Sequence, residues 1–223
     1  MTGVRDMWSR RTVGKIVGAA YDFAVERERL VRPAALALWG TDTRLLFDAI
    51  RSLGELPDGA AVLDIPCGGG LALRGLREGQ AVRYVAADIS PEMLARTRRR
   101  AAALGRDDVQ STEADIERMP FDDGEFDLCL CFNGFHCLSD PAAAVREIAR
   151  CLAPGGRLVG DAVTRGAGRR HDMAIAAAQF GGFFGPGGTA TDLRRWLSDA
   201  GLQVERFDRS GAVVHFCAVR AAG

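Results

Sequence analysis

The chain has 223 residues, of which 48% are hydrophobic and 26% are charged, a composition typical of a globular protein with one substantial core. Its 29 basic residues balance 29 acidic ones, and this zero net charge argues against a protein that binds by neutralising nucleic-acid phosphates. No apolar run is long enough for a transmembrane segment, and the N-terminus lacks the apolar core of a signal peptide. We therefore expect a cytoplasmic protein without a nucleic-acid partner.

The six cysteines predict free thiols, because a chain of this length does not need disulfides to fold. Cys129 and Cys131 would share one face of a strand, and no C-x-x-C pair occurs. His136, His171 and His215 stand far apart in the sequence. The spacing of these side chains therefore predicts no metal site.

Residues 1–55 are expected to form helices that precede the main fold. Two runs of mixed apolar and charged residues, 13–30 and 34–53, are separated by Pro33, and Gly54 follows the second run. These helices would form an extension at the N-terminus.

From residue 60 onward, short β-rich runs alternate with helical stretches. The strand candidates are 61–65, 82–87, 126–132, 156–163, 203–208 and 212–220. The helix candidates are 71–77, 91–104, 141–152 and 191–200, with a short helix around 172–180 inside a long irregular region, 164–190. This alternation indicates an α/β fold with a doubly wound, mostly parallel sheet. The last two strands are joined by a few residues only, so they should form an antiparallel hairpin.

A glycine-rich loop follows the first predicted strand, and open parallel sheets bind ligands at that edge. The sequence DIPCGGG, residues 64–70, has three consecutive glycines, so its backbone can approach a ligand closely. Asp88 ends the next strand, where an acid can accept both ribose hydroxyls of a nucleoside. The loop lacks the third glycine of a dinucleotide site and the lysine of a triphosphate site, so a ligand without phosphates fits better. The alternatives are a plain turn for the glycines and a helix cap for Asp64.

Four motifs in register resemble those of a known family. VLDIPCGGG, YVAADIS-PEML, EADIERMPFDDGEFDLCLC and LAPGGRLV are similar, in order and spacing, to the motif series of class I S-adenosylmethionine-dependent methyltransferases, nearest the broad small-molecule, type 11-like group. The resemblance covers residues 60–164 well and the C-terminal hairpin more loosely. It implies a Rossmann-like sheet of seven strands with an antiparallel last strand.

The resemblance also implies which residues bind the cofactor, S-adenosylmethionine. Those expected at its methionine portion are Asp64, Pro66, Cys67, Gly68, Gly69 and Gly70. Those expected at the ribose and adenine are Asp88, Ile89, Met93, Asp115 and the Ile116 backbone amide. Those expected to close over its amino acid end are Phe132 and Asn133. The family commonly has glycine at position 66, but the expected role there is that of a carbonyl, which proline retains.

A sulfonium methyl group is already activated, so the protein mainly has to hold the acceptor in line and exclude water. His136 is the one imidazole expected near the catalytic edge, either as a general base or as a residue that orders its loop. The acceptor pocket is expected between an N-terminal cap, residues 1–55, and the insertion 164–190 of the cofactor-binding domain, residues 56–223. The side chains expected to line it are Tyr21, Phe23, Trp39, Met173, Phe180, Phe183 and Phe184. This lining favours a small hydrophobic metabolite as the methyl acceptor.

Two alternative functions stay open from the sequence. A nicotinamide-dependent oxidoreductase would use a similar sheet, but the missing third glycine disfavours it. A non-catalytic protein that binds S-adenosylmethionine would keep the same loop, because methyl transfer requires no particular catalytic residue. The sequence predicts neither the identity of the acceptor nor the oligomeric state.

Overall fold

The structure is a computed structural model that describes residues 28–222, with side chains from Arg32 onward. The expected helix at 13–30, with Tyr21 and Phe23, therefore lies almost wholly outside the described residues. The described chain forms one seven-stranded sheet of order β3-β2-β1-β4-β5-β7-β6. Its strands are β1 Ala61–Asp64, β2 Arg83–Asp88, β3 Gln110–Glu113, β4 Phe126–Cys131, β5 Leu152–Val163, β6 Leu202–Ser210 and β7 Val213–Arg220. Strand β7 is antiparallel to both of its neighbours, and the other pairs are parallel, which confirms the predicted fold class.

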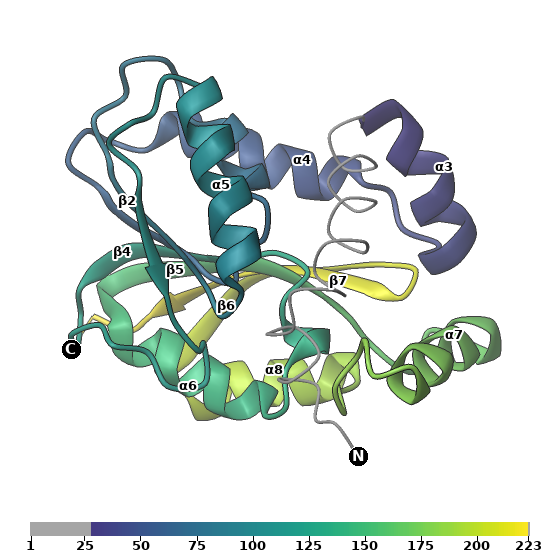
Figure 1. The fold of residues 1–223 in the computed structure, drawn as a ribbon. Coiled ribbons are helices and arrows are strands. Elements are labelled where there is room, and N and C mark those ends of the chain that lie inside the picture. The colour runs from purple at the N-terminus through teal and green to yellow at the C-terminus, as the bar shows by residue number, and fades with distance from the viewer. Residues whose placement is uncertain (1–27, 223) are drawn as a thin grey trace.

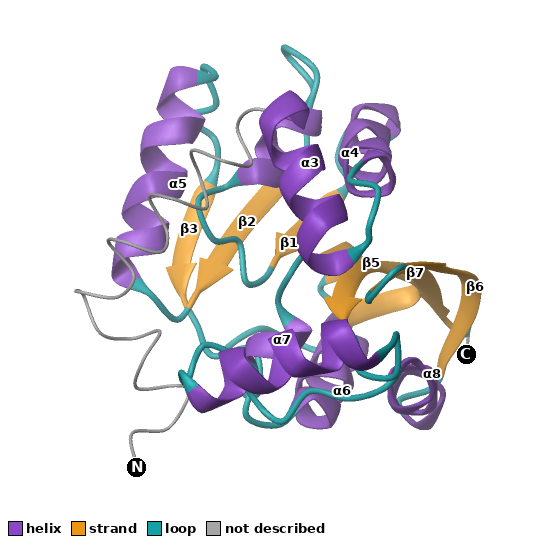
Figure 2. Cartoon of the chain, turned by 90° about the vertical axis from the view of Figure 1, so that its right-hand side faces the viewer, coloured by secondary structure: helices purple, strands orange, loops and turns teal. Residues whose placement is uncertain are grey.

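Helices cover both faces of this sheet. They are α3 Glu28–Trp39, α4 Arg44–Arg51, α5 Pro91–Ala103, α6 Pro141–Cys151, α7 Arg169–Phe180 and α8 Ala190–Asp199, with short 3-10 turns at Ser52–Glu55, Leu71–Gly75 and Phe135–Cys137. Figure 1 shows α4 and α5 over one face and α6 and α8 over the other. In Figure 2, α3 and α7 lie at the front, on either side of the sheet edge. None of the described helices is both long and apolar enough to cross a membrane.

Two hydrophobic clusters fill the spaces between the sheet and its helices. The cluster on the α6 and α8 side contains Phe126, Ile148, Leu158, Leu197 and Phe216, all fully buried or nearly so. The cluster on the α5 side contains buried residues of β1, β2 and β4 together with α5. Because side chains on both faces of the parallel strands are buried, the free ends of the strands are the part of the sheet that a ligand can reach.

Four expectations about individual elements are wrong. The expected second helical run, 34–53, is divided at residues 40–43, since α3 ends before Gly40, which has φ 66°, and α4 begins at Arg44. Helix α3 continues through Pro33 to Trp39, since a helix interior can hold a proline at the loss of one backbone hydrogen bond. The expected helix at 71–77 is a 3-10 turn that ends at Gly75, whose backbone lies against the Ile50 carbonyl of α4. A Cβ at Gly75 would be 1.8 Å from that oxygen, so only glycine allows this close contact with α4. Strand β3 was not among the predicted strands, because its residues are polar and only partly buried at the sheet edge.

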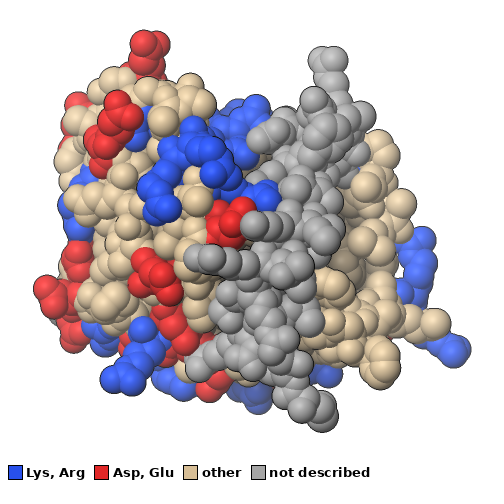
Figure 3. Space-filling view, viewed as in Figure 1, with Lys and Arg blue, Asp and Glu red and all other residues tan. Residues whose placement is uncertain are grey.

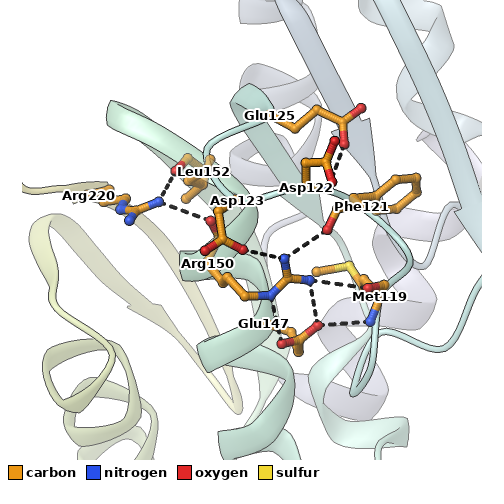
Figure 4. Close-up of polar contacts among 9 residues, drawn as sticks. All are labelled: Met119, Phe121, Asp122, Asp123, Glu125, Glu147, Arg150, Leu152 and Arg220. Atoms are coloured by element: carbon orange, nitrogen blue, oxygen red, sulfur yellow. Dashed lines mark hydrogen bonds and ion pairs between the residues drawn. The ribbon is translucent and has the colours of Figure 1, made fainter.

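Arg150 of α6 holds the segment between β3 and β4 against that helix (Figure 4). Its guanidinium donates to the backbone carbonyls of Phe121, at 2.8 Å, and Met119, at 3.2 Å. It also donates to Asp123 Oδ1 at 2.7 Å and to both carboxylate oxygens of Glu147. Glu147 in turn accepts the Met119 backbone N–H at 2.9 Å. One side chain thus satisfies several polar groups of a loop that leads into β4.

Replacing Arg150 by alanine should lower the free energy of unfolding by about 2 kcal/mol, because hydrogen bonds that involve charged groups each contribute roughly 1.5–3 kcal/mol and only part of this group is exposed. For a chain of this size the expected fall in melting temperature is roughly 4–8 °C. Thermal unfolding followed by circular dichroism measures it. Arg146→Ala is the matched control on the same helix, since Arg146 is mostly exposed and makes one long ion pair with Asp140. Equal melting temperatures for the two variants would contradict this role of Arg150.

Candidate cofactor and acceptor site

The loops that follow β1, β2 and β4 meet at one edge of the sheet. In the sheet register, Asp64 at the end of β1 lies beside Ala86 of β2 and Leu130 of β4. The Ile65 N–H donates to the Leu130 carbonyl at 3.0 Å, and the Cys67 N–H donates to the Ala87 carbonyl at 2.8 Å. The glycine-rich loop therefore crosses from the end of β1 to the end of β2.

The side chain of Asp88 holds the glycine-rich loop by hydrogen bonds. Its side chain is buried, and its Oδ2 accepts the Gly68 N–H at 2.9 Å while its Oδ1 accepts the Ser90 N–H at 2.9 Å. Burial raises the pKa of this carboxyl to about 6, against the lowering effect of the backbone donors. The loop geometry therefore depends on a carboxylate whose ionised form is destabilised by burial unless a positive charge lies nearby.

The N–H and the carbonyl of Gly68 each form a hydrogen bond to a side chain, while no described residue covers its Cα. Thr97 of α5 donates its hydroxyl to the Gly68 carbonyl at 2.8 Å, opposite the bond from Gly68 N–H to Asp88. Gly68 has φ 52°, and a Cβ built on it would meet no atom of the described residues within 4 Å. The Ile65–Pro66 peptide bond that precedes it is cis. The described part of the chain thus leaves the space beside the Gly68 Cα free, which is what close approach of a ligand requires.

Asp64 is buried next to Asp88 and accepts a hydrogen bond from a tyrosine hydroxyl. The Tyr84 hydroxyl donates to Asp64 Oδ2 at 2.8 Å. Burial raises the pKa of Asp64 to about 7, the Tyr84 hydrogen bond lowers it, and the charge of Asp88 raises it further. Among the described residues, neither carboxylate forms an ion pair with lysine or arginine. Two buried carboxylates that lack a basic partner favour a ligand that carries positive charge.

Asn133 follows β4 in a backbone conformation that is rare for a residue with a side chain. Its φ is 53°, and its N–H donates to Asp161 Oδ1 at 2.7 Å. Asp161 is buried near the end of β5, and burial raises its pKa to about 7. His215 Nδ1 of β7 lies 3.8 Å from Asp161 Oδ2. Asp161 therefore ties the turn that contains Asn133 to the neighbouring strand.

The residues expected near the adenine lie beside the ends of β2 and β3. The Ala114 N–H donates to the Asp88 carbonyl at 3.1 Å, which places the segment after β3 next to the end of β2. Asp115 is half-buried and accepts the Glu117 N–H at 3.0 Å, whereas the Ile116 side chain belongs to the buried core. Met93 is buried in the first turn of α5, where its N–H donates to the Ser90 hydroxyl, and Ile89 is half-buried at the end of β2.

His136 connects three segments of the chain. It lies in the short turn after β4, and its buried ring accepts the Val163 N–H of β5 on Nδ1 at 3.4 Å. Its ring packs edge-on against Phe184, with centroids 4.4 Å apart, and its carbonyl accepts the Gly185 N–H at 2.9 Å. Burial lowers the pKa of His136 to about 4, so the imidazole is neutral at pH 7.

The aromatic residues expected at the acceptor pocket divide into two groups. Trp39 stacks on Phe184, with centroids 5.8 Å apart, and Phe184 in turn contacts His136. Phe180 is 98% exposed and Phe183 is 37% exposed, whereas Trp39 and Phe184 are half-buried. Met173 is also exposed, at 72%.

Three residues that hold the site together were not predicted from the sequence. Tyr84 orients Asp64, Thr97 holds the Gly68 carbonyl, and Asp161 holds the Asn133 N–H. The one signal available in the sequence was Asp161, an acid inside the apolar strand pattern GRLVGDAV. A tyrosine in a strand and a threonine on the buried face of a helix are common in protein cores and do not stand out.

Comparisons with known proteins agree with this geometry. The model of the methyltransferase domain family matches residues 63–160. A demethylmenaquinone methyltransferase from Thermus thermophilus is 43% identical over 99 residues, 44% of each chain. A ubiquinone biosynthesis O-methyltransferase from Xanthomonas euvesicatoria is 33% identical over 158 residues, 66% of this chain and 64% of that one. The chain thus matches about two-fifths to two-thirds of the length of these curated relatives.

A solved structure with the same fold is a geranyl diphosphate methyltransferase in complex with GPP and sinefungin. It superposes with a TM-score of 0.68 at 17% identity and covers 80% of this chain and 78% of its own. The sheet order, the glycine-rich loop after β1 and the acid at the end of β2 are thus found together with the domain match. Residues 63–160 thus match the methyltransferase domain family, and the described chain has the fold of the class I S-adenosylmethionine-dependent methyltransferases.

Proposed function

We propose that this chain binds S-adenosylmethionine and transfers its methyl group to a small hydrophobic metabolite. The observation that carries the proposal is the pair of buried carboxylates, Asp64 and Asp88, at adjoining strand ends beside Gly68, whose Cα no described residue covers. S-adenosylmethionine has a positive sulfonium and a positive amino group, so it supplies the charge that these carboxylates lack. Its ribose has two hydroxyls that an ionised carboxylate binds well.

The residues present fit this cofactor. Asp88 accepts the Gly68 N–H on one oxygen and the Ser90 N–H on the other, and the Ile89 N–H also stabilises its carboxylate. A carboxylate has about four lone-pair sites, so acceptor capacity remains for a ribose hydroxyl. Asp64 and the loop from Pro66 to Gly70 would hold the methionine portion. Other residues proposed to contact the cofactor are Ile89, Met93, Asp115 and the Ile116 amide at the adenine, and Phe132 and Asn133 at the amino acid end.

When bound, S-adenosylmethionine supplies an activated methyl group, so the chain has to position the acceptor and exclude water. We assign the cover of the site to residues 1–55 on one side and to the insertion 164–190 on the other. The contacts of α4 support this assignment, since Leu46, Phe47 and Ile50 pack with Phe132 at the end of β4. The Ala212 N–H also donates to the Trp39 carbonyl at 2.8 Å, which fixes the end of α3 on the β6–β7 hairpin.

The acceptor class follows from the aromatic group and from the relatives. Trp39 and Phe184 offer flat apolar surfaces next to His136. The curated relatives are named for menaquinone and ubiquinone precursors, which supports an aromatic or isoprenoid acceptor here. The cytoplasmic location and the absence of a nucleic-acid partner stay predictions from the sequence.

The proposal is tested by calorimetry followed by a turnover assay. The full chain should bind S-adenosylmethionine and S-adenosylhomocysteine and should not bind NAD. It should then form S-adenosylhomocysteine when demethylated quinol precursors are offered. Cofactor binding without turnover on any acceptor of this class would favour the non-catalytic binding protein, and tight NAD binding would favour the oxidoreductase.

Asp88→Ala should weaken S-adenosylmethionine binding at least tenfold, since hydrogen bonds from the ribose to a charged acceptor contribute roughly 1.5–3 kcal/mol each. Asp88→Asn, which keeps the shape of the side chain, should lose affinity in the same direction. Isothermal titration gives the dissociation constants, and the melting temperature of each variant checks the fold. Asp107→Ala is the control, because Asp107 is exposed on the surface. An unchanged affinity in a folded Asp88→Asn protein would sink the ribose assignment.

Affinity for S-adenosylmethionine should fall as the pH drops from 8 to 5.5. Burial raises the pKa of Asp64 to about 7 and that of Asp88 to about 6, so both carboxylates become neutral over this range and lose their attraction for a cation. Each carboxylate that must be ionised costs about tenfold in affinity for every pH unit below its pKa. S-adenosylhomocysteine, which has no sulfonium charge, should depend on pH less strongly. Identical pH profiles for the two ligands would contradict the electrostatic role of these carboxylates.

His136→Ala should lower the melting temperature and the cofactor affinity together with the turnover rate, because His136 joins β5, the turn after β4 and the insertion. We therefore assign His136 to loop ordering rather than to general base catalysis. Because the pKa of His136 is about 4, the turnover rate at saturating cofactor should show no histidine titration near pH 6.5. His171→Ala is the control. A fall in turnover of roughly 10²–10⁴ with unchanged stability and cofactor affinity would instead establish a general base.

A further inference from the structure

The solvent-facing side of α7 is apolar. Its exposed residues follow a spacing of three or four, which places them on one face of the helix: Arg169, Met173, Ala176, Ala177 and Phe180. Met173 is 72% exposed and Phe180 is 98% exposed. Ile175, on the other side, is buried against Val163 and Val213. A surface helix normally turns its polar face to water, so this helix presents a face without a partner.

Helix α3 also exposes apolar side chains. Leu36 is 45% exposed and Leu38 is 52% exposed, on different sides of the helix because they are two residues apart. Pro33, Ala34 and Ala37 are exposed as well. The two helices are in contact, and Arg170 Nη2 of α7 donates to the Ala37 carbonyl at 2.7 Å. Figure 2 shows both helices at the front of the molecule. We call Leu36, Leu38, Met173 and Phe180, with the small residues between them, the α3–α7 surface.

The first turn of α7 and the segments beside it have four exposed arginines, together with the half-buried Asp172, which accepts the Gly166 N–H. The arginines are Arg165, Arg169, Arg170 and Arg209. Arg209 reaches the Gly166 carbonyl at 2.6 Å, so it lies beside the loop that enters α7. In the part of the chain that the structure describes, none of the four forms an ion pair within 4.0 Å of a carboxylate, although the charge of Arg165 interacts with Asp192. The right-hand edge of the view in Figure 3 shows blue and tan atoms.

We propose that the α3–α7 surface docks on an anionic lipid bilayer. Exposed Phe, Leu and Met side chains insert at the boundary between headgroups and acyl chains, and nearby arginines are attracted to anionic headgroups. A second copy of the chain fits this surface less well, because a twofold interface would bring the same arginines of both copies together. The inference goes beyond the proposed methyl transfer and does not rest on it. It also gives a hydrophobic acceptor a route to the same side of the molecule, where α3 and α7 flank the Trp39–Phe184 stack.

The test is co-sedimentation of the full chain with lipid vesicles. The protein should bind vesicles of equal parts phosphatidylcholine and phosphatidylglycerol, and Phe180→Asp should weaken that binding about tenfold. Leu104→Asp is the control, since Leu104 is an exposed apolar residue just beyond α5, away from this surface, at 45% exposure. It should bind like the wild-type protein. Cofactor affinity, measured on the same samples, should be unchanged by Phe180→Asp, which separates this test from that of the methyl-transfer proposal.

A second comparison tests the electrostatic part of the proposal. Arg169→Glu should weaken binding to the anionic vesicles, and Arg146→Glu, on the exposed side of α6, should not. Vesicles of phosphatidylcholine alone should bind the wild-type protein more weakly. The proposal is overturned if the wild-type protein does not sediment with anionic vesicles, or if Phe180→Asp and Leu104→Asp bind alike. It is also overturned if light scattering shows a dimer that Phe180→Asp dissociates while no vesicle binding occurs.

Discussion

The site depends on the burial of two carboxylates where β1 and β2 end. Asp64 and Asp88 are both removed from water, and burial raises both pKa values toward neutrality. In a protein that did not use them, such groups would be replaced or paired with a basic side chain, because burying an unpaired charge is unfavourable. A cationic ligand that reaches both carboxylates supplies the missing charge.

The rest of the edge keeps these two carboxylates in place. Tyr84 holds Asp64, Thr97 holds the loop on its other side, and Asp161 holds the turn after β4. Each of these contacts joins a different strand or helix to the loops, so the ligand edge is rigid although it consists mainly of loops. The side of the site proposed for the acceptor differs, since its side chains are apolar and partly exposed. Rigid polar contacts therefore surround the proposed cofactor, and adaptable apolar ones surround the proposed acceptor.

The sequence pattern was sufficient for the fold and for the two central carboxylates, and the reasons are local. Apolar runs separated by helical stretches locate β1, β2, β4 and β5, and a strand followed by glycines locates Asp64 and its loop. Strand β3 could not be predicted, because an edge strand with polar residues has no such pattern. The roles of Tyr84, Thr97 and Asp161 could not be predicted, because these roles come from contacts between segments that are distant in the sequence. The exposure of Phe180 was likewise hidden, since α7 is apolar on both its buried and its exposed sides.

The most direct test of the central claim is a crystal structure of the chain grown with S-adenosylmethionine. The account predicts density for the cofactor across the ends of β1 and β2, with the ribose hydroxyls on Asp88, the methionine portion along the loop from Asp64 to Gly70, and the adenine beside Asp115. It also predicts that Gly68 and Asn133 keep the positive φ angles they have here. Cofactor bound elsewhere, or a loop that leaves Asp88 when the cofactor binds, would contradict the claim that these buried carboxylates form the cofactor site.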